Sequence, residues 1–257
     1  MKQDKEYLPT DKSGRQNRAR IVVTIPCFNE ADFIGDVVRR TTHYVDEVIV
    51  VDDGSNDNTS ELAREAGALV VRHPYRRGAG AATRTCFKTA IANGADIVVT
   101  MDGDNQHYPE EIPQLIAPLL RNEADLVIGS RFLGSDCNTP RYRELGIRVI
   151  TTLLNFGSKV AVSDAQSCFR AHDRALIDSL SITEDGFGFS IEVLMEAERR
   201  GLRITEVSTR CLYHSQCSTM NPIRHGFGLI VVLAKLRLKY LRSRWNRNGH
   251  IDINRYP

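Results

Sequence analysis

The sequence lacks the cysteine and histidine spacings that mark metal-binding modules and dithiol redox motifs. None of its six cysteines forms a CxxC pair, and no histidine completes a zinc pattern. Reduced thiols in a cytoplasmic compartment are the simplest interpretation, and we expect all six to be free. They are Cys27, Cys86, Cys137, Cys168, Cys211 and Cys217.

Long hydrophobic runs and a strong charge excess are also missing. The longest charge-free apolar runs, such as 226–234, fall well short of the ~20 residues that a membrane-spanning helix needs. Residues 1–20 are polar and charged, so we expect no secretory leader. A formal net charge of +2 gives the molecule no general basic excess, which argues against a nucleic-acid partner.

The chain does have a regular alternation of short β-rich runs and helical spacings. Its 257 residues and 42% hydrophobic composition suit one domain with a substantial core. The alternation predicts an α/β fold with a mostly parallel central sheet and helices on both faces. Strands are expected near 21–25, 47–51, 68–71, 97–101 and 126–128, with helices near 142–158, 187–200 and 224–242 and short strands near 203–213.

Composition divides the chain into three parts. Residues 1–19 are polar and are expected to form a disordered tail. Residues 20–222 carry the alternating pattern and form the expected catalytic domain. Residues 223–257 are expected to form a basic amphipathic helix with its own tail.

Acidic residues follow two of the expected strands, where parallel sheets bind their ligands. Asp102 and Asp104, separated by one glycine, suit Mg²⁺ or Mn²⁺ with positions left open for phosphate oxygens. They equally fit an ordinary Asp-Gly turn. Asp52 and Asp53 follow the second strand, and they either accept hydrogen bonds from a nucleoside or cap the helix that begins near Thr59.

Arginines after the fifth strand are candidate phosphate ligands, because guanidinium forks bind phosphate bidentately. Each of them also fits a solvated helix face. The candidates are Arg131, Arg141, Arg143 and Arg148.

The C-terminal segment combines an apolar stripe with basic residues at helical spacing. Such a helix suits an anionic membrane surface, or it packs on the domain as a terminal helix with a solvated cationic face. The apolar positions are Phe227, Ile230, Val231, Ala234, Leu238, Leu241 and Trp245, and the basic ones are Lys235, Arg237, Lys239, Arg242 and Arg244.

Five motifs, taken in order, resemble glycosyltransferase family 2, and specifically its dolichyl-phosphate (polyprenyl-phosphate) sugar synthase branch. The resemblance runs from about Arg20 to about Leu241. The first two motifs are family-wide, whereas the third and fifth are more specific to lipid-phosphate acceptors. They are Pro26-Cys-Phe-Asn-Glu30, Val51-Asp-Asp-Gly-Ser55, Asp102-Gly-Asp-Asn-Gln-His107, Gly129-Ser-Arg131 and Asp164-Ala-Gln-Ser-Cys-Phe-Arg170.

The resemblance implies a GT-A type fold and an inverting, metal-dependent hexosyltransferase. The donor would be a GDP- or UDP-sugar of the mannose, glucose or N-acetylglucosamine type. The acceptor would be dolichyl or polyprenyl phosphate, reached by peripheral contact with an anionic membrane. Asp102 and Asp104 would hold Mg²⁺ or Mn²⁺, and Asp104, Arg131 and Arg143 would be catalytic, the two arginines binding the acceptor phosphate. The nucleotide-sugar site would comprise Pro26, Phe28, Glu30, Val51, Asp53, Asp102 and Gln106.

Three positions depart from the family pattern. Phe28 stands where tyrosine is usual, which loses a phenol contact but keeps stacking. Cys168 stands where glycine is usual, and cysteine resists a positive φ. Arg76-Arg77 replaces a segment that often contains asparagine.

Two alternative functions stay open. A soluble family 2 enzyme with a saccharide or protein acceptor would need an extra carboxylate as general base, whereas a phosphate acceptor is already anionic. Glu184, Asp185 and Glu192 are the candidates for that base. A nucleotide-sugar-binding subunit without catalysis is less favoured, because both metal carboxylates are present.

Overall fold

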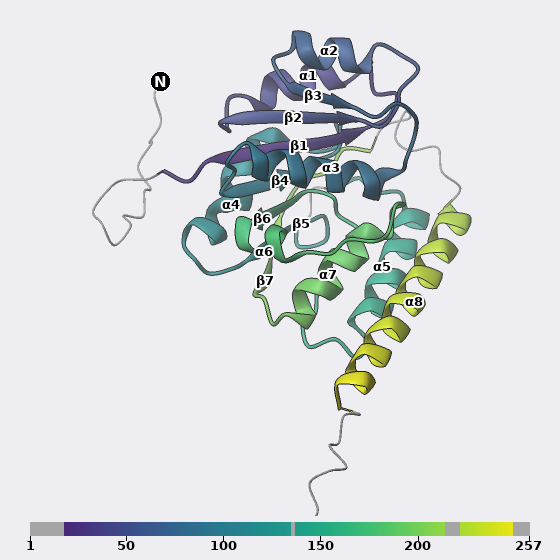
Figure 1. The fold of residues 1–257 in the computed structure, drawn as a ribbon. Helices are drawn as coiled ribbons and strands as arrows, with labels where there is room; N and C mark the ends of the chain where they lie inside the picture. Colours follow the sequence, from purple (N-terminus) through teal and green to yellow (C-terminus); the bar gives the residue numbers. More distant parts are fainter. Residues whose placement is uncertain (1–17, 135–136, 214–221, 249–257) are drawn as a thin grey trace, which may run out of the picture.

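The computed structural model describes residues 18–134, 137–213 and 222–248. The part of the predicted tail before Arg18 and the residues after 248 therefore lie outside it. Within the described ranges, one sheet carries helices on both of its faces (Figure 1). The strands are β1 (Ile21–Cys27), β2 (Glu47–Asp52), β3 (Leu69–Arg72), β4 (Ile97–Thr100), β5 (Leu126–Ser130), β6 (Arg170–Asp173) and β7 (Ile204–Ser208).

The helices alternate with the strands in the first half and gather together in the second. They are α1 (Ile34–Thr41), α2 (Thr59–Glu65), α3 (Ala79–Ala92), α4 (Ile112–Leu120), α5 (Arg141–Asn155), α6 (Arg174–Ser179), α7 (Phe189–Arg199) and α8 (Pro222–Asn248). A 3₁₀ turn, Pro109–Glu111, leads into α4, as expected from proline at a first helical position.

The strand order in the described sheet is β3-β2-β1-β4-β6-β5-β7. Every neighbouring pair is parallel except those of β6, which runs antiparallel to both β4 and β5. The predicted mostly parallel α/β sheet is therefore confirmed. β6 and α6 were not predicted, because Arg170-Ala-His-Asp173 has neither an apolar run nor an apolar alternation.

Strand residues are apolar on both faces because helices cover both. On β1, Val23 and Ile25 pack in one core cluster with residues of α1 and α4. Val22, which points to the other face, packs in a second cluster with Ala82 and Phe87 of α3. This double coverage explains why the first strands read as unbroken hydrophobic runs in the sequence.

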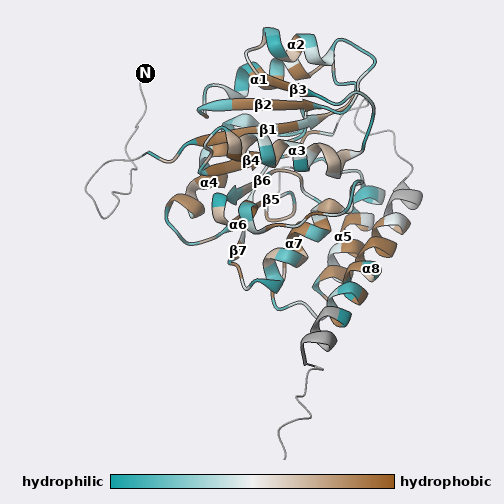
Figure 2. Ribbon diagram, in the orientation of Figure 1, coloured by the Kyte–Doolittle hydropathy of each residue, from teal (hydrophilic) through white to brown (hydrophobic). Residues whose placement is uncertain are grey.

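The helices α5, α7 and α8 form a third core cluster over β5. The inner face of α8 contributes Leu229, Leu233 and Leu236, which are buried together with Ile150 and Leu154 of α5. Both α5 and α8 also carry hydrophobic segments that are not covered (Figure 2). In the described residues, no helix has the length and apolar content to cross a membrane.

Candidate active site

The carboxyl ends of β1, β2, β4 and β5 open onto a cleft of about 1150 Å³. Its volume suits a ligand as large as a nucleotide sugar. The lining residues come from all five motifs and from the start of α5, so the sheet edge gathers the segments that the sequence placed after its strands. Of the predicted site residues, the cleft is lined by Pro26, Phe28, Glu30, Asp53, Asp102, Asp104, Gln106, Arg131 and Arg143. Val51 is fully buried in the core beside Ala82.

Asp102 and Asp104 stand at the end of β4, each with a neighbour that orients it. His107 Nε2 lies 3.3 Å from Asp102 Oδ2. The side-chain amide of Gln106 donates to Asp104, and the Gln106 backbone N–H donates to Asp104 Oδ1 over 3.2 Å. Asn105 allows the tight turn between Asp104 and Gln106, because its φ of 60° lies in the left-handed region that asparagine tolerates.

Acidic side chains crowd around this pair. Burial and then the charges of Asp104 and Asp102 raise the pKa of Glu30 to about 8. Burial and the charge of Asp102 likewise raise the pKa of Asp104. Asp102 differs: burial acts to raise its pKa, but the hydrogen bond with His107 and the nearby positive groups outweigh it and lower the pKa.

The acidic pair fits a divalent cation that a substrate helps to hold. Within the described residues, no group of three or more His, Cys, Asp or Glu side chains is arranged to hold a metal ion alone. Mg²⁺ typically takes one or two protein carboxylates and completes its shell with phosphate oxygens and water. Asp102 and Asp104, which lie beside Glu30 and open to a large cleft, match that pattern.

A different pair of side chains lines the cleft beside the first motif. The Arg76 guanidinium carbon lies 4.1 Å from the centre of the Phe28 ring, a cation–π contact. The sequence did not predict a role for Arg76, because the residues around it do not show that its side chain contacts Phe28. Cleft residues Phe28 and Arg76 therefore present a ring and a planar cation on which a base can stack.

Asp53 shapes the loop that carries Arg76. Its carboxylate accepts the backbone N–H groups of Arg77 and Gly78 over 2.9 and 2.7 Å, and lies 2.7 Å from His73 Nδ1. Gly78 has a φ of 105°, and a β-carbon there would collide with the carbonyl oxygen of Asp185. Asp53 therefore holds this loop and does not cap α2, and its contact with a nucleoside stays a prediction.

Asp52 and the first motif form a braced pair of loops. Asp52 Oδ1 accepts the Ser55 backbone N–H over 2.8 Å, which holds the turn after β2. The Ser55 hydroxyl in turn accepts the N–H of Asn29 over 2.9 Å. Asn29 has a φ of 57°, so asparagine serves the backbone here too. Gly54 completes the turn, because a β-carbon would lie 2.6 Å from the Tyr75 carbonyl carbon.

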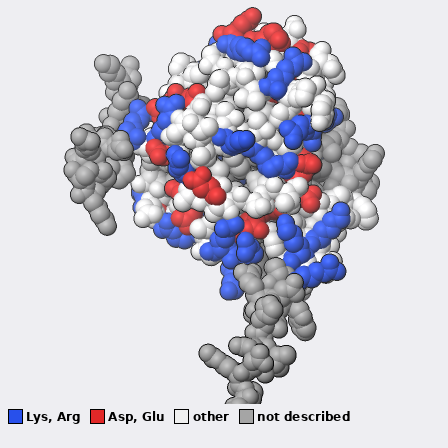
Figure 3. Space-filling view, viewed as in Figure 1, with Lys and Arg blue, Asp and Glu red and all other residues white. Residues whose placement is uncertain are grey.

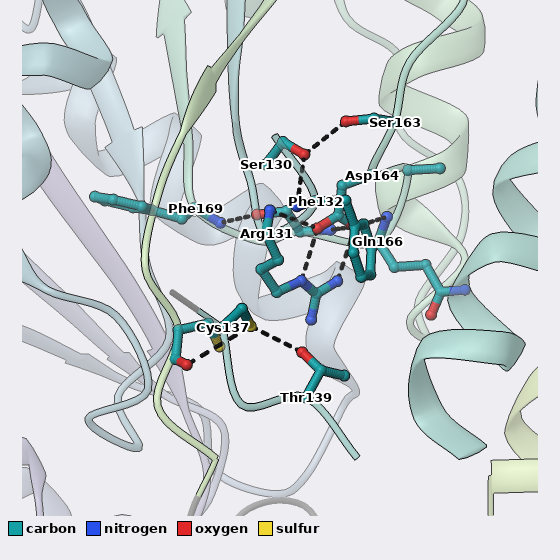
Figure 4. Close-up of polar contacts among 12 residues, drawn as sticks. Ser130, Arg131, Phe132, Cys137, Thr139, Ser163, Asp164, Gln166 and Phe169 are labelled. Atoms are coloured by element: carbon teal, nitrogen blue, oxygen red, sulfur yellow. Dashed lines mark hydrogen bonds and ion pairs between the residues drawn. The ribbon is translucent and has the colours of Figure 1, made fainter. Parts of the chain in front are cut away.

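Arg131 is held in the cleft wall by a buried carboxylate (Figure 4). Its Nε and Nη2 donate to Asp164 over 2.6 and 2.8 Å, and its Nη1 donates to the Tyr213 hydroxyl over 2.8 Å. Arg131 is 9% exposed and Asp164 is 0% exposed. Although burial opposes both charges, the pair holds the pKa of Arg131 well above and that of Asp164 below its usual range.

The other candidate arginines divide between the cleft and the surface. Arg143 lines the cleft, with its guanidinium carbon 5.7 Å from the centre of the Tyr213 ring. Arg148 pairs with Glu144 one turn earlier on α5, as a solvated helix face would. Asp164 and Tyr213 were missing from the predicted site list, although Asp164 belongs to the fifth motif.

Cys168 occupies the position of the usual glycine without backbone strain. In the described part of the chain, the non-glycine residues with positive φ are Asn29, Asn105 and Asn122. Cys168 thus adopts an ordinary conformation, and its carbonyl accepts the Thr100 hydroxyl over 2.7 Å. The five described cysteines are free, while Cys217 lies outside the described residues.

Two of the three carboxylates considered as a general base, Glu192 and Asp185, are held by other groups. Glu192 is fully buried and accepts the backbone N–H groups of Thr183 and Glu184 and the Thr183 hydroxyl. Asp185 pairs with Arg84. In this region of the described chain, Gly186 and Phe187 form the cleft wall.

Comparison with known proteins identifies the family. The model of "Glycosyl transferase family 2" matches residues 22–181, which span β1 to α6. The chain belongs to glycosyl transferase family 2. The matched range contains Asp102 and Asp104, the Asp164–Arg131 pair and the Phe28–Arg76 contact.

Relatives of this family 2 glycosyltransferase include enzymes named for lipid-phosphate acceptors. It is 32% identical over 245 residues to the UDP-N-acetylglucosamine–dolichyl-phosphate N-acetylglucosaminyltransferase of Methanococcus voltae, covering 85% of this chain and 96% of the relative. It is 31% identical over 201 residues to the polyprenol monophosphomannose synthase of Mycolicibacterium smegmatis, covering 73% and 76%.

Solved structures confirm the GT-A fold. Glucosyl-3-phosphoglycerate synthase of Mycobacterium tuberculosis, in complex with Mn²⁺, UDP and glucosyl-3-phosphoglycerate, superposes with a TM-score of 0.68 at 28% identity. The superposition covers 85% of this chain and 80% of that one.

Proposed function

We propose that this family 2 glycosyltransferase moves a sugar from a nucleoside-diphosphate sugar to the phosphate of a polyprenyl lipid. The observation that carries the proposal is a single cleft lined by both the Asp102–Asp104 pair and the arginines Arg131 and Arg143. The names of the relatives from Methanococcus voltae and Mycolicibacterium smegmatis support the acceptor class. Which sugar and which nucleoside are used stays open.

The donor half of the site binds a nucleoside diphosphate by three means. Phe28 and Arg76 stack on the base, and Asp53 holds the loop that positions Arg76. Asp102 and Asp104 would hold Mg²⁺ or Mn²⁺, which supplies positive charge to the departing diphosphate when bound. Gln106 and His107 orient the two carboxylates. The Mn²⁺ and UDP in the mycobacterial structure support this arrangement.

The acceptor half needs charge and position in place of a base. A phosphate monoester is already anionic at neutral pH, its second pKa lying near ~6, so no side chain has to take a proton from it. Arg131 and Arg143 at the cleft wall supply positive charge, and the Asp164 clamp fixes the direction in which Arg131 points. Two of the three candidate bases, Glu192 and Asp185, are held by other groups, which supports a phosphate acceptor over an alcohol.

A peripheral membrane contact completes the proposal, because the lipid chain of the acceptor costs too much to extract at ~0.8 kcal/mol per CH₂. On α8, the predicted apolar stripe faces away from the core: Phe227 is 68% exposed, Leu238 56% and Leu241 63%. On α5, Leu145 and Val149 are exposed as well. Both helices border the cleft, through Gly146 of α5 and Gly226 of α8.

Basic side chains accompany this apolar surface (Figure 3). Lys235 and Arg242 are exposed. Arg237 instead donates to the Leu153 carbonyl at the end of α5 over 2.7 Å, and Lys239 lies 3.7 Å from Glu192. The side chains of Arg244 and Trp245 lie outside those described. Arg237 is thus turned towards the protein, whereas Lys235, Lys239 and Arg242 stay exposed for contact with anionic lipid. A cytoplasmic location stays a prediction.

The function is tested by following labelled sugar from UDP- and GDP-sugars in the presence of Mn²⁺ and polyprenyl phosphate. We expect label in an organic-extractable, acid-labile lipid. Label found only in water-soluble products would replace the proposal with the soluble alternative. That alternative has one observation in its favour, since the mycobacterial structures include phosphoglyceric acid, a water-soluble phosphate.

The membrane contact is tested with vesicles containing anionic lipid. Leu238→Asp combined with Leu241→Asp should lower co-sedimentation and slow transfer to vesicle-embedded acceptor, while sparing a short water-soluble prenyl phosphate. Leu69→Asp, at an exposed leucine on the edge strand β3, is the matched control. Equal losses on both acceptors would assign α8 to folding and not to the membrane.

A further inference from the structure

Two cysteines far apart in the sequence meet beside the cleft. Cys137 and Cys211 form an isolated parallel β-bridge. The Cys137 sulfur lies 3.6 Å from the Cys211 carbonyl oxygen, across 74 residues of chain. Bridged backbones lie about 4.8 Å apart, inside the 4.4–6.8 Å range of Cα separations that a disulfide spans.

Hydrogen bonds next to the bridge hold the two segments, and therefore the two cysteines, together. One residue beyond Cys137, the Asn138 side chain accepts the Tyr213 N–H over 2.8 Å and donates to the Tyr213 carbonyl over 3.3 Å. The Tyr213 hydroxyl in turn accepts a hydrogen bond from Arg131 Nη1. Thr139 lies 2.8 Å from the Cys137 sulfur, and Figure 4 shows both residues on the side of Arg131 away from Ser163.

The two thiols differ in access and reactivity. Cys137 is half-buried, whereas Cys211 is buried. The neighbouring Cys211 side chain lowers the pKa of Cys137 against the effect of burial, and Thr139 and Arg131 add to this, giving about 6. Among the described cysteines, burial raises the pKa of Cys27, Cys86 and Cys168. Among the described cysteines, Cys137 is thus the one that is ionised near neutral pH, and it should react first with an oxidant.

We propose that Cys137 and Cys211 are an oxidation site whose reversible disulfide switches off sugar transfer. A hydroperoxide is the oxidant. The Cys137 thiolate attacks one peroxide oxygen, the O–O bond breaks, and hydroxide or alkoxide leaves, so that Cys137 becomes a sulfenic acid. The Cys211 sulfur then attacks the Cys137 sulfur, the S–O bond breaks, and the oxygen leaves as water with the Cys211 proton. A dithiol reverses the reaction by exchange.

The disulfide acts on the cleft through Gln106. The Cys211 sulfur lies 3.8 Å from Gln106 Oε1, and the next residue, Leu212, donates its N–H to the Gln106 carbonyl over 2.9 Å. Gln106 also holds Asp104. In the disulfide, the Cys211 sulfur lies about 2.0 Å from the Cys137 sulfur. It then turns away from Gln106 and no longer carries an S–H group that can donate to Gln106. The inhibitory part of this proposal rests on the proposed function, whereas the disulfide does not.

The experiment treats the full reduced chain with hydrogen peroxide at neutral pH and maps its peptides without reduction. We expect a Cys137–Cys211 cross-link and a fall in transfer rate of about tenfold to a hundredfold, the cost of misplacing a catalytic group by roughly 1 Å. Dithiothreitol should restore the rate. Each variant is compared with its own untreated rate: Cys137→Ser and Cys211→Ser should form no cross-link, and Cys137→Ser should resist reversible loss. Cys86→Ala, at a buried core cysteine, should behave like the parent.

A cross-link to another cysteine, Cys217 included, would overturn the proposal, as would irreversible oxidation of Cys137 alone. A mapped Cys137–Cys211 disulfide with an unchanged transfer rate would overturn the switch. If the untreated protein transferred no sugar to lipid, the proposed function would fail, and the peptide map would still decide whether this disulfide forms.

Discussion

Breaking the Arg131–Asp164 pair should destabilise the protein as well as impair sugar transfer. Both charges are buried, and Asp164→Asn leaves the Arg131 guanidinium without its countercharge. Removing one partner of a buried pair costs about 3–5 kcal/mol. An independent estimate agrees, since two unit charges about 4 Å apart interact by about 4 kcal/mol at an effective dielectric constant near 20. For a chain of this size, that loss lowers Tm by roughly 6–20 °C.

The assay is urea and thermal unfolding of Asp164→Asn, Arg131→Ala and the double variant Arg131→Met/Asp164→Leu. The double variant removes both charges with apolar side chains, so it should recover most of the stability lost by either single change. It should not recover transfer, because Arg131 lines the cleft. Arg64→Ala is the control: its partner Glu61 lies 3.7 Å away and both side chains are about half exposed, so the change should cost under about 1 kcal/mol.

Two results would refute this reasoning. Single variants as stable as Arg64→Ala would mean that the pair is not effectively buried in solution. A double variant less stable than either single variant would mean that packing, and not the unpaired charge, causes the loss. A stable but inactive double variant would separate the role of Arg131 in catalysis from its role in folding, which Arg131→Ala alone does not.

Three further predictions follow from the site. Asp102→Asn or Asp104→Asn should abolish transfer and the stabilisation by Mn²⁺ with UDP in a thermal-shift assay, and full activity in saturating chelator would contradict the metal role. Arg76→Ala should weaken nucleotide binding by about 1 kcal/mol in titration calorimetry, with an unchanged Kd speaking against the Phe28 stack. The lowered pKa of Asp164 makes its contribution to stability complete above its unfolded pKa of about 3.9 and lost as pH falls through the folded value. Asp164→Asn should therefore flatten the dependence of the unfolding free energy on pH in acid, and parallel curves for the two proteins would exclude this.

The architecture of the first half and the position of its acidic residues could be predicted from the order of the amino acids alone. Strands near 21–25, 47–51 and 97–101 were predicted to within two residues, because burial on both faces leaves unbroken apolar runs that need no knowledge of their neighbours. The acidic pair Asp102–Asp104 was placed at the cleft for the same reason, since the ends of parallel strands share one edge of a sheet.

The contacts of the polar residues became clear only from the folded structure. The sequence offered Asp53 as a nucleoside ligand or a helix cap, and it gave no sign that this carboxylate holds the loop at Arg77, 24 residues away. Arg131 finds Asp164 33 residues away, and Cys137 meets Cys211 at 74. Strand β6 enters the sheet with a buried arginine that donates to the carbonyl oxygens of Ser190 and Ala165. Hydrogen bonds and ion pairs depend on which distant segments meet, whereas apolar periodicity is a local property of the chain.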